Sequence, residues 1–222
     1  MVQHLTAQDE NILTSRDLIM KGTAFDTLLN RKILDKDIDI SKMLAGDKMA
    51  VMIWLRINGY GADYHVEVMD PHSFERFPAI VDLRLLKHKP ISNVPNGEGL
   101  FHYQLPVSKR NVLFRILTEA ESLSLEKQVE GMSKMGNTGI DQTVTMTLKT
   151  QIVDVDGNRD KFWISKFVDT MNVRDSRRLQ LFMGEVYPGL DMSYTFTNPN
   201  TGRTFQANVP VEMELFYPTK GL

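Results

Sequence analysis

The sequence predicts an α+β protein in which two helical segments are each associated with small antiparallel β elements. Apolar residues recur at helical spacing in several segments, and strict alternation of apolar and polar residues marks short strands between them. Of the 222 residues, 42% are hydrophobic and 24% are charged, which is typical of a folded globular chain. A glycine-rich linker over 131–139 divides the chain into halves at 1–130 and 140–222, unless the two form one integrated domain.

In the first half, helices are predicted to precede the strands. Apolar clusters at 12–19 and 25–29 predict short helices, and Ser41 is a candidate N-cap for a helix that runs to about Ile57. Trp54 falls on the apolar side of that helix, so we expect it to be buried in the core. Alternating patterns then predict strands at 64–68, 81–85, 101–105 and 112–117.

The first half ends with a helix that Thr118 and Glu121 open as a capping box and that runs to about Gly131, where the linker begins. Segment 141–153 satisfies both the strand period and the helix period, so its state is left open. Asp160 and Asp175 are each predicted to cap a helix. A hairpin with its turn at 198–202 closes the predicted fold.

Composition excludes several classes of function. Cysteine is absent, which excludes a disulfide scaffold, a cysteine nucleophile and a thiolate zinc site, so no metal or cofactor is predicted. The formal net charge of −2 argues against a protein that coats nucleic acid. The longest apolar run, 49–55, is too short to cross a bilayer, and the first ten residues lack the pattern of a signal peptide, so no membrane partner is predicted.

Two charged clusters are candidates for chemistry. Asp154, Asp156 and Asp160 have the spacing of a calcium loop, but the glutamate that such a loop needs at its twelfth position is missing. We interpret this segment as a turn followed by a helix cap, with a metal-dependent enzyme as the alternative. A basic cluster could bind phosphate or nucleic acid, although a solvated helix face is the favoured interpretation. Its helical members are Arg174, Arg177 and Arg178.

A pair of similar turns is the most informative pattern. Each turn has a small polar residue, proline, one further residue and a hydroxyl residue, and each follows a predicted strand. The same spacing forms the knuckle of a zinc ribbon when cysteines take the first and fourth positions. We therefore expect the two turns to lie side by side, as a ribbon that has lost its cysteines, with hydrogen bonds among the four residues in place of metal bonds. The four positions, called the turn tetrad below, are Asp70, Ser73, Asn198 and Thr201.

Several short runs match a known family in their order and spacing, although no single run is diagnostic. They include LAGDK at 44–48, WLRINGYG at 54–61, QIVDVDG at 151–157, YPGLD at 187–191 and FYP at 216–218. Through these runs, roughly over residues 20–218, the chain resembles the baseplate hub assembly proteins, or hub assembly chaperones, of T-even-type bacteriophages. Many members of that family carry Cys-Pro-x-Cys at the two turns where this chain has the turn tetrad.

This resemblance implies a non-enzymatic structural or assembly protein of a contractile phage tail that binds other baseplate or tail proteins. It would act in the cytoplasm of the bacterial host during assembly, and it either stays in the virion baseplate or leaves. Candidate contact surfaces are the exposed part of residues 1–36 and the pair Phe216 and Tyr217, unless the N-terminal segment packs on its own core. A metal-dependent enzyme and a nucleic-acid-binding accessory protein are the alternatives, and the oligomeric state is not predicted.

Overall fold

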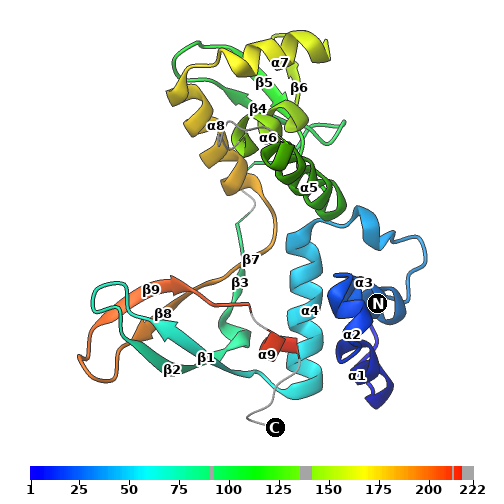
Figure 1. Ribbon diagram of the computed structural model, residues 1–222, viewed down its shortest axis with the longest axis vertical. Helices are drawn as coiled ribbons and strands as arrows, with labels where there is room; N and C mark the ends of the chain where they lie inside the picture. The colour runs from blue at the N-terminus through cyan, green and yellow to red at the C-terminus, as the bar shows by residue number, and fades with distance from the viewer. Residues whose placement is uncertain (91–92, 136–141, 212, 217–222) are drawn as a thin grey trace. The chain divides into compact units, whose positions relative to one another are not determined.

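The computed structural model describes residues 1–90, 93–135, 142–211 and 213–216, and within them the fold is α+β, as predicted. The chain divides into two compact units. Unit 1 contains residues 1–40, 45–89 and the described part of 189–222, whereas unit 2 contains 41–44 and the described part of 90–188. Figure 1 shows the elements of each unit.

These units differ from the predicted halves. The second half is split between the units. Its last hairpin, at 193–208, packs with elements of the first half in unit 1, whereas the helices of the second half belong to unit 2. The predicted linker is also different: residues 131–135 are the last turns of a helix, and the remainder of 131–139 lies outside the described residues. The distance between two hairpins along the chain does not predict whether they share a unit, because hairpins pack together through their apolar faces wherever those faces fit.

Unit 1 combines a helical layer with two hairpins. A helix from the N-terminal layer, α3, packs between α1 and α4, and buried Lys32 on α3 pairs with buried Asp9 on α1. The N-terminal helices are α1 (Ala7–Leu13), α2 (Arg16–Met20), α3 (Ala24–Lys32) and α4 (Ala45–Tyr60), with a short 3-10 turn η1 (Ile40–Lys42) before α4. The remaining elements are β1 (Asp63–Met69), β2 (Arg76–Asp82), η2 (Leu83–Leu85), β3 (Lys87–His88), β7 (Leu190–Asp191), β8 (Ser193–Thr197), β9 (Thr204–Asn208) and α9 (Met213–Phe216).

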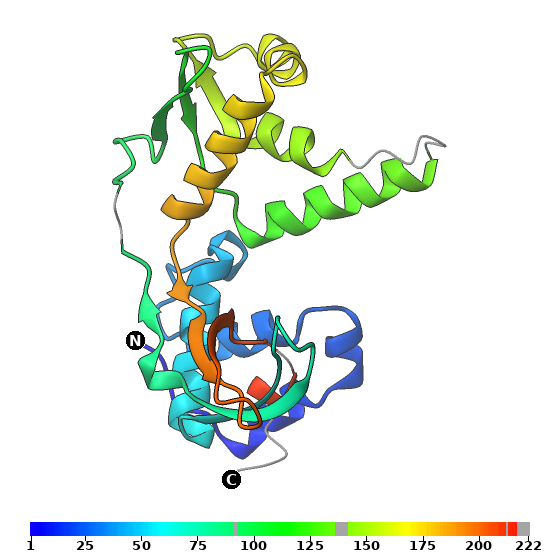
Figure 2. The same cartoon turned by 90° about the vertical axis from the view of Figure 1, so that its left-hand side faces the viewer.

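The strands of unit 1 are all antiparallel. Strand β1 pairs with β2, β8 pairs with β9, and β3 pairs with β7. Figures 1 and 2 show the β1–β2 and β8–β9 hairpins lying against each other. Strand β1 alternates exposed and buried residues without exception, which is the pattern expected of a strand with one buried face. Buried Tyr64 on that face donates its hydroxyl to the carbonyl of Pro210, at 3.0 Å.

Unit 2 is a three-stranded antiparallel sheet, in the order β4–β5–β6, packed with helices. Its core contains the fully buried side chains of Leu105, Val112, Phe114 and Leu179. The ambiguous segment contains both structures, because helix α6 runs directly into strand β6 at Ile152. The elements are β4 (Phe101–Gln104), β5 (Asn111–Phe114), α5 (Glu119–Met135), α6 (Thr143–Gln151), β6 (Ile152–Val155), α7 (Lys161–Asp169) and α8 (Val173–Val186).

Several local predictions are confirmed in unit 2. The backbone N–H of Thr118 donates to the Glu121 carboxylate at 2.9 Å, and the N–H of Glu121 donates to the Thr118 hydroxyl at 3.3 Å, which completes the capping box. The Asp160 carboxylate accepts from the N–H of Trp163 at 2.7 Å and caps α7. In unit 1, by contrast, residues 83–85 form the 3-10 turn η2 instead of the end of the predicted strand, because the Asp82 carboxylate caps that turn.

Candidate functional site: two matching hairpin turns

The turn of the β1–β2 hairpin is closed by the side chain and backbone of Asp70. Its carboxylate oxygen Oδ1 accepts from the N–H groups of His72 at 2.8 Å and Ser73 at 3.4 Å. Its carbonyl accepts from the N–H of Phe74 at 2.8 Å, and its N–H donates to the carbonyl of Glu75 at 2.9 Å. This is the Asx type of turn that the Asp-Pro pair predicts.

The turn of the β8–β9 hairpin repeats this arrangement. The amide oxygen of Asn198 accepts from the N–H groups of Asn200 at 2.9 Å and Thr201 at 3.3 Å. Its carbonyl accepts from the N–H of Gly202 at 2.8 Å, and its N–H donates to the carbonyl of Arg203 at 2.9 Å. The two turns therefore have the same hydrogen-bond scheme, position by position.

One buried hydrogen bond joins the turns across 128 residues of sequence. The Asn198 amide nitrogen donates to the Asp70 carboxylate oxygen Oδ2 at 2.9 Å, and both side chains are buried. The hairpins also meet through the rings of Phe77 on β2 and Phe205 on β9, which pack edge to face with their centroids 6.2 Å apart. The prediction that the two turns lie side by side is confirmed.

The other half of the turn tetrad does not take part in that bond. Ser73 and Thr201 are exposed, and each hydroxyl accepts from a backbone N–H within its own turn, at 3.4 Å and 3.3 Å. The predicted hydrogen bonding among all four residues is therefore wrong in part. The hydroxyls stabilise the turns separately, and within the tetrad only Asp70 and Asn198 connect the turns. Outside the tetrad, the exposed Asn200 amide also donates to the Glu75 carboxylate across the two turns.

The electrostatics of the pair suit a fixed anionic carboxylate. Hydrogen bonds from the Asn198 amide and the His72 N–H hold the pKa of Asp70 below its ordinary value. Within the part of the chain that the structure describes, no three histidine, cysteine, aspartate or glutamate side chains gather as a metal site would require. The pair holds two hairpins together, and nothing in it provides a nucleophile beside a base. The likeness to a zinc ribbon gains no support beyond this juxtaposition of turns.

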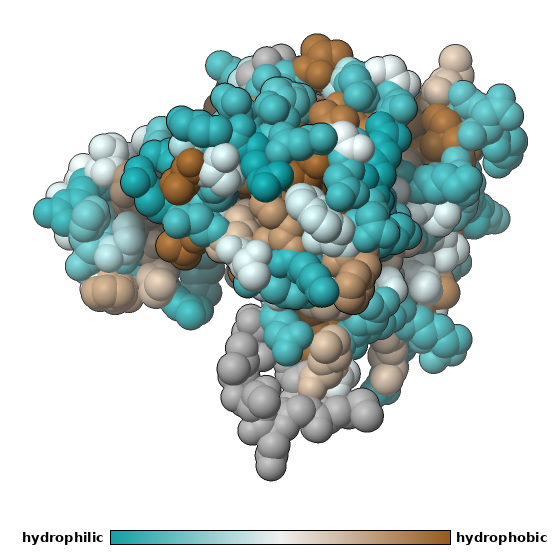
Figure 3. Space-filling model, turned by 90° about the horizontal axis from the view of Figure 1, so that it is seen from above, coloured by the Kyte–Doolittle hydropathy of each residue, from teal (hydrophilic) through white to brown (hydrophobic). Residues whose placement is uncertain are grey.

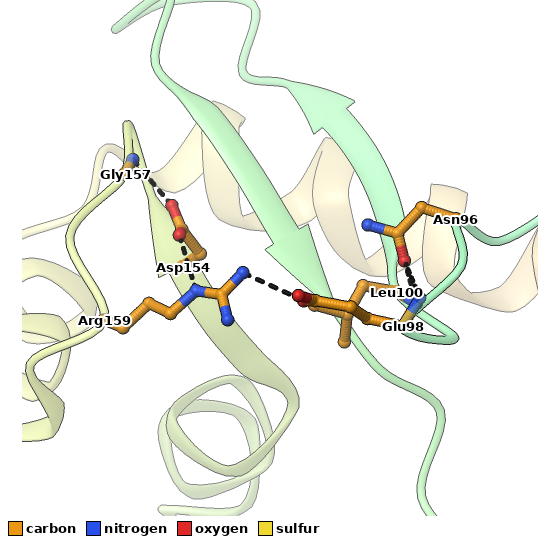
Figure 4. Close-up of polar contacts among 6 residues, drawn as sticks. All are labelled: Asn96, Glu98, Leu100, Asp154, Gly157 and Arg159. Carbon is orange, nitrogen blue, oxygen red and sulfur yellow. Dashed lines mark hydrogen bonds and ion pairs between the residues drawn. The ribbon is translucent and has the colours of Figure 1, made fainter.

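The aspartate loop in unit 2 is a hydrogen-bonded turn, as interpreted from its sequence. Buried Asp154 accepts from the N–H of Gly157 at 2.6 Å and from the Nε of Arg159 at 3.0 Å (Figure 4). Arg159 also pairs with Glu98 at 2.9 Å, so this arginine ties the turn to the loop that contains Asn96.

The other two carboxylates of this loop have separate partners. Asp156 accepts from the N–H of Asn111 at 2.8 Å and pairs with Arg110 at 3.1 Å, and these contacts hold the pKa of Asp156 below its ordinary value. Asp160 is occupied as the cap of α7. Because the three acids are directed to different partners, their geometry offers no support for the metal-dependent alternative.

The basic cluster lies on the exposed side of α8. Arg174, Arg177 and Arg178 are exposed, as a solvated helix face requires. Asp175, predicted as a cap, lies inside the first turn of α8, and Asn172 is the N-cap. Asp175 accepts instead from the N–H groups of Val107 at 2.7 Å and Ser108 at 2.9 Å. Burial alone would raise the pKa of Asp175, but those bonds lower it below its ordinary value.

Two aromatic predictions are wrong. Phe216 was a candidate contact residue, yet it is buried with its ring 4.3 Å from that of Phe25, and Tyr217 lies outside the described residues. Trp54, predicted in the core, is 40% exposed. It borders a shallow apolar hollow of about 300 Å³ that Val2, Ala50 and Val51 also line. Periodicity identifies an apolar face but not whether the rest of the chain covers it.

Sequence reasoning missed Phe74. Its φ of +57° lies in the left-handed region, where the matching turn has Gly202 at +68°. Aligning the two turns by their proline residues would have revealed an aromatic residue where the backbone favours glycine.

No protein family model, curated protein or solved structure matches this chain. Among the helices of the described residues, none is both long and apolar enough to cross a membrane.

Proposed function

We propose that this chain is a non-enzymatic structural or assembly protein of a contractile phage tail, which acts through protein–protein contacts at the baseplate hub. The order and spacing of the short runs quoted above support the phage family. The chemistry of the described residues supports the mechanism, because their acids and arginines mainly hold turns, caps and helices in place.

The observation that carries the proposal is the exposure of Trp54 beside the apolar hollow. Trp54 is 40% exposed, and the ring of His4 lies 5.6 Å from its own between centroids. Tryptophan is enriched among the residues that dominate binding energy in protein interfaces, particularly where it fills or borders a pocket. An exposed tryptophan beside a hollow lined by valine and alanine is suited to receive an apolar side chain of a partner.

One face of the molecule is mostly polar. Figure 3 shows a face on which hydrophilic residues predominate and hydrophobic residues lie in small, separate groups. Small apolar groups within a polar surface are typical of proteins that bind partners after folding, rather than of obligate dimers with one large apolar face.

Mass spectrometry of purified virions and of tail assembly intermediates tests the proposal. An assembly protein is expected in intermediates, and a structural protein in both samples at a fixed ratio to the hub. If the chain is absent from both, the proposal is refuted. Trp54→Ala should weaken its incorporation while leaving the folded fraction unchanged, and a variant that incorporates normally would remove the role proposed for the hollow.

A further inference from the structure

The outward face of the β1–β2 hairpin displays apolar side chains that nothing in the described structure covers. Residues paired across an antiparallel hairpin lie on the same face, and here the exposed pairs are Met69–Arg76, Glu67–Pro78 and His65–Ile80. Met69 is 50% exposed and Ile80 is 57% exposed. The opposite face is buried. A strand face that is solvated throughout would be expected to carry polar residues at these positions.

The tip of this hairpin presents an aromatic side chain under backbone strain. Phe74 has φ of +57°, a conformation in which its Cβ crowds the following carbonyl, and glycine occupies the equivalent position of the matching turn. Its side chain is 74% exposed, so burial within the chain does not compensate for this strain. Residues held in such conformations tend to lie at functional sites, and an outlier of this kind is evidence from which a role can be inferred.

Charge distinguishes this hairpin from its neighbour. Residues 63–84 include five acidic and two basic residues, whereas the second hairpin, 193–208, has one arginine and no acid. Of the two arginines, Arg84 is paired with Asp82. Glu67 lies among the apolar residues of the outward face, and among the described residues it has no ion pair.

Of the remaining charges of this hairpin, Asp70 is buried and Arg76 is exposed beside Met69. Exposed acids, with Asp63 and Glu67 among them, therefore outnumber the exposed arginine that has no ion pair in the described part of the chain, and the apolar face has an excess of negative charge.

This charge pattern favours a different protein over a second copy of the chain. A twofold contact would place the same patch against itself and bring acidic residues together. Like charges brought together across an interface disfavour association, whereas opposite charges favour it and speed it.

We propose that the β1–β2 hairpin docks an apolar segment, rich in lysine or arginine, of a partner protein. The docking surface consists of Met69, Phe74, Pro78 and Ile80, with Glu67 as the acidic contact. Phe74 is the anchor, because an exposed aromatic side chain has large area and few rotatable bonds. That the partner is a tail protein rests on the function proposed above. The apolar and basic character of its segment is inferred from this hairpin alone.

The test uses the full-length tagged chain, produced together with the other tail proteins of its phage. Phe74→Asn is the main variant, because asparagine tolerates the left-handed region and should keep or raise the melting temperature. Phe162→Asn is the matched control, because Phe162 is similarly exposed, at 70%, on α7 of unit 2. We expect Phe74→Asn to weaken the complex by roughly tenfold or more and Phe162→Asn to leave it unchanged.

Glu67→Lys tests the chemistry of the partner segment. It should weaken the complex and reduce its sensitivity to salt, because an attractive charge becomes repulsive. Equal binding by the two asparagine variants, or tighter binding by Glu67→Lys, would overturn the inference while leaving a tail-protein complex intact.

Cross-linking separates this inference from the proposed function. A photoreactive benzoylphenylalanine replaces Phe74 in the full chain, and the adduct is mapped to a peptide. An adduct with a basic, apolar segment supports the inference, even if its owner is not a tail protein, in which case only the proposed function fails. An adduct with an acidic segment or with a second copy of the chain overturns the inference. The inference also fails if benzoylphenylalanine at position 74 gives no higher cross-linking yield than benzoylphenylalanine in place of Phe162.

Discussion

Asn198→Ala should destabilise unit 1 far more than its small change in volume suggests. The Asn198 side chain is fully buried, and its amide donates to a carboxylate at 2.9 Å. A hydrogen bond to a charged group contributes about 1.5–3 kcal/mol. The bond it accepts at 2.9 Å from the N–H of Asn200 adds about 1 kcal/mol, and the longer one from Thr201 adds less. We expect a total loss of about 2–4 kcal/mol in the free energy of unfolding.

The two tryptophans allow this loss to be assigned to one unit. Trp54 belongs to unit 1 and Trp163 to unit 2. In a Trp163→Phe background, urea unfolding followed by fluorescence therefore reports unit 1, and in a Trp54→Phe background it reports unit 2. With a slope of about 2 kcal/mol per molar urea, the expected loss lowers the midpoint of unit 1 by about 1–2 M. The midpoint of unit 2 should stay unchanged.

Asn200→Ala is the matched control, because it is the same substitution two residues away in the same turn. The Asn200 side chain is exposed and bonds to Glu75, so its loss should stay below about 1 kcal/mol. If Asn198→Ala destabilises unit 1 no more than this control, the buried bond between the turns does not hold the hairpins together. If it shifts both units equally, the assignment of the turn to unit 1 is wrong.

Three further variants give independent tests. Trp54→Ala should lower the free energy of unfolding, measured in urea, by less than about 2 kcal/mol. A fully buried tryptophan would lose about 3–5 kcal/mol, whereas the Trp54 side chain is 40% exposed. Replacing all four residues of the turn tetrad with cysteine should create a site that takes up one zinc per chain and raises the melting temperature; a folded variant that ignores zinc contradicts the knuckle geometry. Contacts with Arg115 and Thr118 lower the pKa of Glu121 from 4.5 to about 2. The ionised Glu121 therefore adds about 1 kcal/mol, after solvent screening, to the free energy of unfolding of unit 2. This stabilisation is complete above pH 4.5 and is lost as the pH falls towards 2. Glu121→Gln should remove this part of the acid dependence of unit 2 unfolding, and an unchanged pH profile would show that the pair contributes nothing.

Local sequence was sufficient wherever the stabilising contacts lie within a few residues. The capping box at Thr118 and Glu121, the cap at Asp160 and both proline turns were predictable, because each side chain bonds to a backbone N–H two or three positions along the chain. The α+β class followed from the same local patterns. The meeting of the two turns was also predicted, but through their likeness to paired knuckles rather than through any local contact.

Tertiary structure alone decided the features that depend on distant parts of the chain. Trp54 is exposed and Phe216 is buried, although both are aromatic residues in apolar runs, because what covers a side chain comes from elsewhere in the fold. Asp175 binds the N–H groups of Val107 and Ser108, which lie 68 and 67 residues away, so its position near a helix start suggested the wrong partner. Periodicity records which face of an element is apolar; whether that face is buried depends on packing between segments that the sequence keeps far apart.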